Sequence, residues 1–402
     1  MIKFEKALNI ILKNVTCMSG EKCEINRSCA GRVICENVIS DENIPNCDNS
    51  GMDGYAVKYR DTRRPQTKLK IVGEIKAGTK PQRIIKTGEA IRIMTGAPIP
   101  EGADAVVMIE KTKYLKAKNE VEILGKLKNN ENVRLKGEDI KKGDLVLLRN
   151  TVLSPACMGV LASLGKTSIK LVRKPRVSVI TTGNEIKHFK AKGLAPGQVR
   201  DSNRLSISSS LERDGFTSVF VKKVPDNLKV TKNILKKALS CSDAVIVSAG
   251  ASVGKYDFAR PALKQLGAEF SVDKVAMKPG RPFAFCRIKN LPVFLLPGNP
   301  VSTLVTYEKL VKPALFKMAG KILPPSKVLK AVLLHDIKKE AGRKEFLRGI
   351  LFRKRNGYFA KTTGGQSSGI LNSLVKANCL IVAGEKITLL KKGTKVDVEI
   401  FE

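Results

Sequence analysis

Hydrophobic and polar positions follow two different periods along the chain, and they predict several kinds of structure. Near the start, apolar residues recur at helical spacing, which predicts a helix with one apolar face; they are Ala7, Leu8, Ile11, Leu12 and Val15. Residues 46–138 contain short stretches such as "LKIVGEIKAGTK" and "EVEILGKL", separated by Gly- and Pro-rich turns. This pattern predicts a β-rich module.

Residues 175–325 alternate short apolar runs with helical patterns. The runs are "RVSVI", "SVFVKKV", "DAVIVSA" and "PVFLLPG", and segments such as "NLKVTKNILKKALS" and "VSTLVTYEKLVKPALFKMAG" lie between or after them. This alternation predicts a doubly wound, mostly parallel α/β sheet. After the Pro-rich stretch "LPPSK", which we expect to be a linker, residues 326–402 return to strand-like alternation and predict a small C-terminal β domain. The predicted fold class is therefore a multidomain α/β and β protein.

Charge adds a preference for anionic partners. The 73 Lys and Arg exceed the 37 Asp and Glu, which leaves a formal net charge of +36. A nucleic acid, a phosphate-bearing cofactor or an oxyanion would suit this balance, and so would a Lys-rich solvated surface. The basic residues are spread along the chain, and the absence of Trp with 5% aromatic residues does not favour binding of single-stranded nucleic acid.

The nine cysteines do not form a zinc motif. Cys17, Cys23, Cys29 and Cys35 are spaced by six residues, and the chain has only 2 His, so we expect four small buried thiols. An odd number of cysteines and an N-terminus without a secretory leader pattern favour a reducing, cytoplasmic location. No apolar run approaches the length of a membrane span.

Three loops that follow predicted strands carry Gly and polar residues. Because ligands of doubly wound sheets bind beyond the carboxyl ends of the strands, these loops predict a site for a phosphate-bearing ligand. The candidate binding residues are Thr182, Gly183, Ser248, Gly250, Ser252, Gly254, Pro297, Gly298, Asn299 and Pro300. Purely structural roles are open for the same loops: Asp257 and Asp201 could cap helices, Asn299 and Pro300 could start one, and Glu185 could be solvated.

A basic segment, "DKVAMKPGRPFAF", lies in the same region. It supplies Lys274, Lys278 and Arg281, which suit a small dianion or a phosphate group. If Lys274 begins a strand, it shares a face with Lys278 because their positions differ by an even number.

The stretch "DNSGMDGYAV" places Asp53 directly before Gly54 and two residues after Gly51. Glycine costs conformational entropy, so a carboxylate placed between glycines suggests an acid that has to point in one direction.

These segments, in this order, resemble the molybdopterin molybdenumtransferases of the MoeA type, a family to which the gephyrin E domain is related. "DNSGMDGYAV", "IRIMTGAPIPEGADAVVMIE", "GEDIKKGD", "VITTGNE", "VRDSN", "SAGASVGKYD", "KVAMKPGRPFAF", "LPGNPVS" and "TTGGQSSGILNSLVKAN" are similar to its motifs. The resemblance covers essentially the whole chain. It implies an elongated homodimer of four-domain subunits: residues 1–45 with 139–174, residues 46–138, residues 175–325 and residues 326–402.

The resemblance also implies an activity: adenylylated molybdopterin and molybdate give molybdenum cofactor and AMP, with Mg²⁺. The substrate would come from a molybdopterin adenylyltransferase, and the cleft would lie at a subunit boundary. The matching catalytic positions are Asp53, Thr95, Asp139, Glu185, Asp257, Lys274 and Lys278, with Asp53, Glu185 and Asp257 as candidate Mg²⁺ ligands. Arg281 would assist the anion site, and Arg348 and Ser368 match positions that hold molybdate.

Three positions depart from the family pattern. Gly51 replaces Ala, Arg281 replaces Lys, and Ala249 replaces the first Gly of a pair, so we expect its loop to adopt a conformation that Ala tolerates. Three other functions are also considered: an ATP-dependent molybdopterin adenylyltransferase, a non-catalytic scaffold of the same family, and a nucleic-acid-binding protein. The sequence does not separate molybdate from tungstate, since the two oxyanions have nearly the same size and charge.

Overall fold

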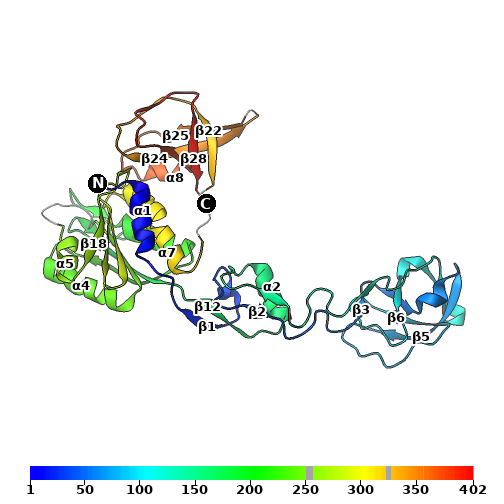
Figure 1. Ribbon diagram of the computed structural model, residues 1–402. Helices are drawn as coiled ribbons and strands as arrows, with labels where there is room; N and C mark the ends of the chain where they lie inside the picture. Colours follow the sequence, from blue (N-terminus) through cyan, green and yellow to red (C-terminus); the bar gives the residue numbers. More distant parts are fainter. Residues whose placement is uncertain (250–256, 323–326, 356, 402) are drawn as a thin grey trace. The chain divides into compact units, whose positions relative to one another are not determined.

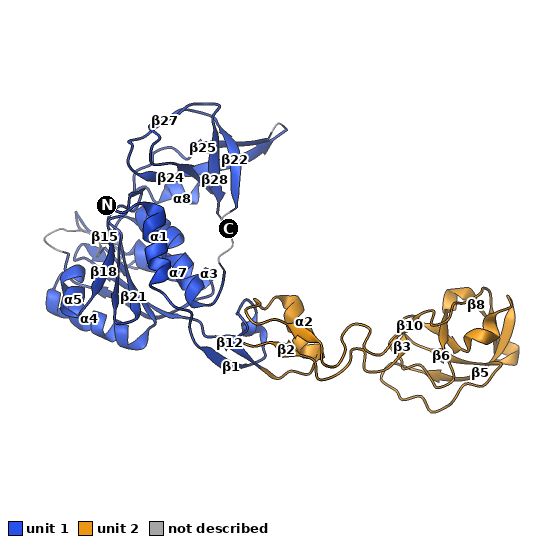
Figure 2. Cartoon of the chain, viewed as in Figure 1, with its two compact units in different colours: residues 1–35, 169–402 blue, residues 36–168 orange. Residues whose placement is uncertain are grey.

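The computed structural model describes the whole chain except residues 250–256, 323–326, 356 and 402. The chain forms two compact units (Figure 2): residues 1–35 with 169–402, and residues 36–168. We describe each unit by itself. The finer division into four domains stays a prediction, and the expected linker at "LPPSK" lies mostly outside the described residues.

The first unit contains a six-stranded sheet between two layers of helices (Figure 1). Its order is β16 (Thr217–Val224), β13 (Arg176–Thr182), β17 (Ala244–Ser248), β21 (Leu291–Leu296), β20 (Ala284–Ile288) and β18 (Glu269–Asp273). The first four strands are parallel, and β20 and β18 run antiparallel to their neighbours. The predicted doubly wound sheet is thus confirmed, and its two antiparallel strands are an addition.

Helices cover both faces of this sheet. Apolar residues of α1 (Phe4–Lys13), α3 (Ser202–Arg213), α6 (Pro300–Thr306) and α7 (Lys312–Met318) pack into one buried cluster. Those of α4 (Leu228–Cys241) and α5 (Ala259–Gln265) pack into a second cluster on the opposite face. The predicted N-terminal helix is α1, with Ala7 and Ile11 fully buried.

The helix expected after "LPGNP" is continuous from Pro300 to Met318 but contains a π-helical segment. Between α6 and α7, residues Tyr307–Val311 form a π-helical segment. Pro313, the second residue of α7, lacks a backbone N–H and so removes one donor from the helical ladder. The predicted helix is therefore confirmed, and the π-helical segment is an addition that apolar periodicity did not show.

The C-terminal residues of the first unit form a closed β-barrel, which agrees with the predicted β domain. The ring is β24 (Lys344–Lys354), β25 (Gly357–Thr362), β22 (Val328–Leu333), β28 (Lys395–Ile400) and β26 (Cys379–Ala383), closed by pairing of β26 with β24. A short strand from the sheet region, β19 (Met277–Lys278), pairs with the start of β24. This pairing attaches the barrel to the basic segment that precedes it.

The second unit is built around a six-stranded sheet, as predicted for the β-rich module. The order is β7 (Ala105–Met108), β4 (Gly54–Val57), β6 (Glu89–Ile93), β5 (Thr67–Ile75), β9 (Glu120–Ile123) and β8 (Thr112–Leu115). The unit also holds α2 (Pro155–Ser163), which Ser154 caps through the amide of Cys157.

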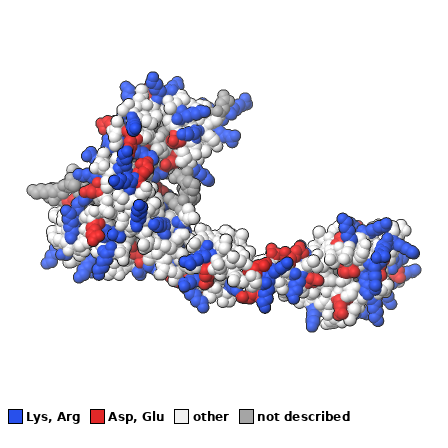
Figure 3. All heavy atoms as spheres, viewed as in Figure 1, with Lys and Arg blue, Asp and Glu red and all other residues white. Residues whose placement is uncertain are grey.

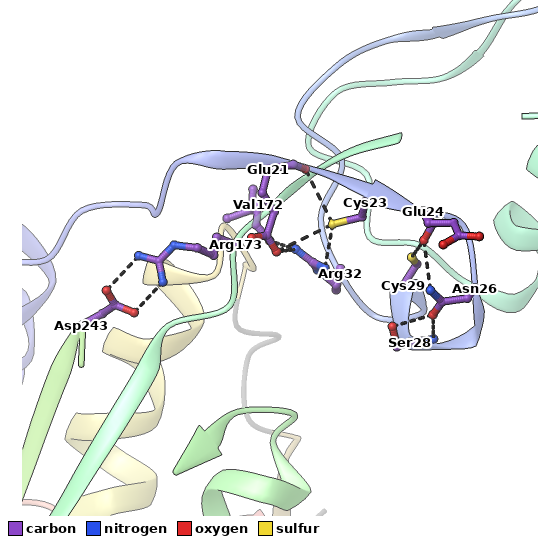
Figure 4. A network of polar contacts seen from close by, with 10 residues as sticks. All are labelled: Glu21, Cys23, Glu24, Asn26, Ser28, Cys29, Arg32, Val172, Arg173 and Asp243. Atoms are coloured by element: carbon purple, nitrogen blue, oxygen red, sulfur yellow. Dashed lines mark hydrogen bonds and ion pairs between the residues drawn. The ribbon is translucent and has the colours of Figure 1, made fainter. Parts of the chain in front are cut away.

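The expectation of four buried N-terminal thiols is wrong for three of them. Cys29 is buried, but Cys23 and Cys35 are half-buried and Cys17 is exposed. The other three lie in or beside the two-stranded ribbon of β1 (Gly20–Glu24) and β12 (Ser168–Val172), where their side chains reach solvent. Arg32 donates to the Cys23 sulfur at 3.1 Å (Figure 4), and burial raises the pKa of the Cys23 thiol.

Lys and Arg side chains are scattered over the visible face of both units, with Asp and Glu among them (Figure 3). This distribution fits the even spread of basic residues along the sequence. None of the helices among the described residues is long and apolar enough to cross a membrane.

Candidate functional site

The turn that presents Asp53 lies between β3 (Asn49–Ser50) and β4 in the second unit. One Asp53 carboxylate oxygen accepts hydrogen bonds from the Thr95 amide at 2.6 Å and from the Thr95 hydroxyl at 2.7 Å. These bonds lower the pKa of Asp53 below its ordinary value, although the side chain is exposed. The predicted site residues Asp53 and Thr95 thus form a pair, with an ionised acid held toward solvent.

Glycine next to Asp53 is a packing requirement. A Cβ on Gly54 would lie 1.8 Å from the carbonyl oxygen of Val107 in the neighbouring strand β7. β4 therefore approaches β7 more closely than a side chain allows. This contact fixes the end of the Asp53 turn, since Asp53 is the residue directly before β4.

Asp139 is also in the second unit, on an exposed turn. Its amide donates to the carbonyl of Ile44 at 3.0 Å. Its carboxylate makes no hydrogen bond or ion pair with any residue that the structure describes, so its predicted catalytic role has no structural test.

In the first unit, Asn203 at the start of α3 joins two of the three predicted loops. Its side-chain amide donates to the Ser248 hydroxyl at 2.9 Å and to the Gly298 carbonyl at 2.7 Å. Ser248 ends β17 and Gly298 follows β21, so one buried amide ties together two adjacent strand ends.

Asp201 and Thr182 connect the third predicted loop, which follows β13, to its neighbours. The Thr181 hydroxyl donates to the Asp201 carboxylate at 2.8 Å, and the Thr182 hydroxyl donates to the Ala249 carbonyl at 2.9 Å. Asp201 also caps α3 through the amide of Arg204, as the structural alternative proposed. The candidate residues Thr182, Ser248 and Gly298 therefore meet at one edge of the sheet.

The expectation for Ala249 is wrong. Its φ is 70°, in the left-handed region that non-glycine residues seldom adopt. Its amide donates to the Leu296 carbonyl at 3.1 Å while its carbonyl accepts from Thr182, and these two bonds hold the conformation. The loop keeps a geometry that suits glycine, and Ala249 bears the strain.

Glu185 folds over the backbone of its own loop. A Cβ on Gly183 would lie 2.5 Å from a Glu185 carboxylate oxygen, and Gly183 has a φ of +140°. The carboxylate is exposed at the same edge as the loops described above. Gly183 is therefore required for the position of the acid.

Asp257 accepts a hydrogen bond from the amide of Ala259 at 3.2 Å, at the start of α5. This agrees with the capping role considered for it, and it leaves a catalytic role open. Three candidates of the same loop, Gly250, Ser252 and Gly254, lie outside the described residues.

The basic segment differs from its predicted geometry. Lys274 does not begin a strand: it follows β18 directly, with a φ of 57°, so the face-sharing argument with Lys278 fails. Lys278 lies in β19, and its ammonium group is 3.4 Å from the carboxylate of Glu345, a residue that is 2% exposed. Arg281 is exposed and forms no ion pair among the described residues.

The C-terminal barrel contributes Ser368 to the loop after β21. The side-chain amide of Asn299 donates to the Ser368 hydroxyl at 2.9 Å, and the amide of Val301 donates to the Ser368 carbonyl at 3.2 Å. Pro300 is at the first turn of α6, as predicted, but the Asn299 side chain makes no cap bond to the helix. Asn299 instead links the barrel to the sheet edge.

Arg348 is a buried cation that lies among hydroxyl and carbonyl groups. It is 1% exposed, and its guanidinium donates to the Ser373 hydroxyl and the Ser367 carbonyl, each at 3.0 Å. Burial lowers the pKa of Arg348. No carboxylate among the described residues pairs with it, which suits a site that receives an anion.

The predicted Mg²⁺ ligands offer carboxylate oxygens, which this ion prefers. Within the described part of the chain, no three His, Cys, Asp or Glu side chains are grouped closely enough to hold a metal. Asp53 belongs to one unit and Glu185 and Asp257 to the other. The metal site therefore stays a prediction.

Two positioning residues were not identified as site residues from the sequence. Asn203 lies in the "VRDSN" motif, and its polarity at the start of a helix was the available signal. Glu345 gave no such signal, because a single Glu in a strand pattern is usually solvent-exposed. Only the pairing of β19 with β24 brings it to Lys278.

Comparison with known proteins covers nearly the whole chain. Residues 2–165 match the MoeA N-terminal region (domain I and II), residues 178–317 a probable molybdopterin binding domain, and residues 330–401 the MoeA C-terminal region (domain IV). The chain is 38% identical over 376 residues to a molybdopterin molybdenumtransferase of Haemophilus influenzae, which covers 92% of both chains.

Two further relatives are similar to this chain over most of their length. A molybdopterin molybdenumtransferase of Nostoc is 36% identical and covers 91% of this chain and 85% of its own. The crystal structure of the molybdopterin biosynthesis moeA protein from Pyrococcus horikoshii matches with a TM-score of 0.82 at 28% identity, over 100% of both chains. On this identity, coverage and shared fold, the chain belongs to the MoeA family of molybdopterin molybdenumtransferases.

Proposed function

We propose that this protein inserts molybdenum from molybdate into adenylylated molybdopterin and releases AMP in an Mg²⁺-dependent reaction. The molybdopterin substrate binds at the strand-end loops that contain Thr182, Ser248 and Asn299. Molybdate binds at the basic groups of the adjacent segment and of the C-terminal barrel. Family membership supports the reaction class, and the geometry supports the assignment of residues.

The observation that carries the proposal is the arrangement around Arg348. Its guanidinium is buried and unpaired by any described carboxylate, and it donates to Ser367, the residue next to Ser368. Ser368 in turn contacts Asn299 in the loop after β21. A tetrahedral dianion would supply the missing negative charge close to the predicted molybdopterin loop.

The acidic residues Asp53, Glu185 and Asp257 would bind Mg²⁺. When bound, Mg²⁺ neutralises charge on the phosphoanhydride that links AMP to molybdopterin. Asp53 would hold it with an oxygen free of Thr95, and Glu185 and Asp257 would hold it from the sheet edge. Lys274, Lys278 and Arg281 neutralise the anions, and Pro297 and Pro300 shape the loop.

The same proposal includes a homodimer in which Asp53 of one subunit serves the sheet edge of the other. It also includes delivery of substrate from a molybdopterin adenylyltransferase and a cytoplasmic location. A reducing compartment suits the exposed Cys17.

The test measures AMP released from adenylylated molybdopterin with Mg²⁺, with and without molybdate. We expect Asp53→Asn to reduce molybdate-dependent release by about 10²-fold or more, because the amide cannot serve as an anionic ligand. Glu110→Gln is the matched control, since Glu110 is an exposed acid of the same module without a side-chain partner among the described residues. Full activity of Asp53→Asn with an unchanged fold would refute the assignment.

The same assay separates the other functions. Consumption of ATP in place of molybdate-dependent AMP release would indicate an adenylyltransferase. Absence of both reactions from the wild-type chain would favour a scaffold. Parallel reactions with tungstate determine which oxyanion is used.

A further inference from the structure

Glu345 is a buried acid where the basic segment meets the C-terminal barrel. It lies near the start of β24 and is 2% exposed. It shares a face of this strand with Leu347, which packs in the buried cluster of the barrel. A carboxylate in such surroundings is unfavourable unless a cation or several hydrogen bonds compensate its charge. The position of Glu345 therefore depends on the cation beside it.

Lys278 is that cation. Its Nζ atom lies 3.4 Å from Oε1 of Glu345, and the two residues are register partners in the pairing of β19 with β24. Among the described residues, this Oε1 atom accepts no hydrogen bond, and its one ion pair is with Lys278. The pairing of two strands from different parts of the chain thus brings this ammonium group to the acid.

A second cation near Glu345 is held by other groups. Nζ of Lys339 donates to the carbonyl oxygens of Gly384 at 3.0 Å and of Ile387 at 2.8 Å. Burial lowers the pKa of Lys339, and the negative charge of Glu345 opposes this shift. Lys339 therefore adds positive charge near Glu345 without taking the place of Lys278.

The Lys278 ammonium group is open on its other side. The side chain of Lys278 is 43% exposed, whereas that of Glu345 is 2% exposed. An ammonium group has three N–H donors, so one that is directed at Glu345 leaves others for a ligand. A lysine held in this way suits an oxyanion, because its flexible side chain is already ordered before the ligand binds.

We propose that Glu345 is a positioning residue for molybdate binding, because it holds the Lys278 ammonium group at the place where the oxyanion binds. The inference rests on the proposed function, in which Lys278 neutralises the anions. Glu345 itself does not touch the substrate and acts through Lys278.

Two substitutions of Glu345 separate its charge from its volume. Glu345→Gln keeps the size and removes the charge, whereas Glu345→Asp keeps the charge on a shorter side chain. AMP release is measured at saturating adenylylated molybdopterin with Mg²⁺, over a range of molybdate concentrations. We expect Glu345→Gln to raise the KM for molybdate about tenfold with little change in kcat, because the ammonium group loses its fixed position before binding. Glu345→Asp should raise this KM less.

Glu340→Gln is the matched control. Glu340 is an acid of the segment before β24, its side chain is 82% exposed, and it pairs with Arg343 at 2.8 Å. We expect the KM of this variant for molybdate to stay within about twofold of the wild-type value. If Glu345 only filled space in the barrel, the order of its variants would be reversed, since Gln fits the same volume and Asp does not.

Denaturant unfolding of the first unit tests the ion pair without depending on activity. Lys278→Met should lower the midpoint, because it leaves a buried carboxylate without its ion pair. Adding Glu345→Gln to the same chain should restore the midpoint. Glu345→Gln alone should not lower it, since the substitution removes a buried charge and leaves the exposed Lys278 in water.

Two results would overturn the role of Glu345 while the proposed function stands. One is a KM for molybdate in Glu345→Gln that equals the wild-type value or is lower than that of Glu345→Asp. The other is an unfolding midpoint that Lys278→Met leaves unchanged. A wild-type chain without molybdate-dependent AMP release would instead refute the proposed function and, with it, this role.

Discussion

Asp53 shows how a single side chain is prepared for chemistry. Two hydrogen bonds from Thr95 reach one carboxylate oxygen, at 2.6 and 2.7 Å. Both donors stabilise the ionised form, which is the form that a cation needs. The pair explains why the chain keeps Thr95 on the turn after β6, opposite the Asp53 turn.

Thr95→Val tests this arrangement. The variant keeps the amide donor and loses the hydroxyl, so the pKa of Asp53 should move up from its lowered position toward the ordinary 3.8. Because Asp53 must be ionised for activity, the acidic limb of the pH–rate profile should shift to higher pH. At pH values below that limb, the rate of the variant should be about tenfold lower than that of the wild type. Thr79→Val, which removes another exposed hydroxyl of the module, should leave the profile unchanged. An unaltered acidic limb in Thr95→Val would contradict the proposed orientation.

At the level of elements, the close approach of β4 to β7 determines the position of the Asp53 turn. We predict that Gly54→Ala destabilises the second unit by about 2–3 kcal/mol or more, because its Cβ would lie 1.8 Å from the Val107 carbonyl oxygen. Gly125→Ala is the control, since no atom lies within 4 Å of a Cβ there. Denaturant midpoints measure both variants, and equal midpoints would show that the strands can separate at little cost.

A second element-level contact lies at the starts of β13 and β17, where Arg173 pairs with Asp243 (Figure 4). Asp243 accepts two hydrogen bonds from Arg173, at 2.7 and 2.8 Å, and one from the Arg176 amide at 2.8 Å. Burial by itself would raise the pKa of Asp243, but these donors hold it below the ordinary 3.8. The contact therefore favours the ionised acid.

Asp243→Asn should lose about 1–2 kcal/mol of folding stability, a value reduced for the partial exposure of Arg173. Since the folded-state pKa is depressed, this contribution is complete above the ordinary 3.8 and disappears as the pH falls through the lower folded value. The free energy of unfolding of wild type and of Asp243→Asn is measured at pH 7 and at about pH 2–3, and the two values should converge at the lower pH. Asp397→Asn, which removes an exposed partner of Lys330, should change stability little at either pH. If the free energies of unfolding of wild type and Asp243→Asn differed by the same amount at all pH values, ionisation of Asp243 would not contribute to stability.

At the level of the whole molecule, the proposed dimer predicts complementation between inactive chains. Asp53→Asn and Lys278→Ala alter different units of the subunit. If each site combines Asp53 of one chain with Lys278 of the partner, random mixing after dissociation should restore about a quarter of wild-type AMP release. Half of the dimers are then mixed, and each has one intact site. No recovery, despite subunit exchange shown by mass-labelled chains, would place both residues in a site of one chain.

The sequence by itself determined the classes of structure and the chemistry. Period-two and helical patterns predicted the doubly wound sheet, the β-rich module and the C-terminal β domain, because burial of one face acts locally on spacing. The strand-end loops and the MoeA motifs identified most candidate residues. Local pattern was silent at two places: it predicted the helix of residues 300–318 but not the π-helical segment within it, and it did not show that the condition of a strand starting at Lys274 is unmet.

Only the tertiary structure decided which distant residues meet. The contacts of Asn203 with Ser248 and Gly298, of Ser368 with Asn299 and of Lys278 with Glu345 each join positions far apart in the chain. No local spacing encodes them, because they depend on strand order and on the pairing of β19 with β24. The left-handed Ala249 has the same origin: hydrogen bonds from neighbouring strands impose a conformation that its own side chain disfavours.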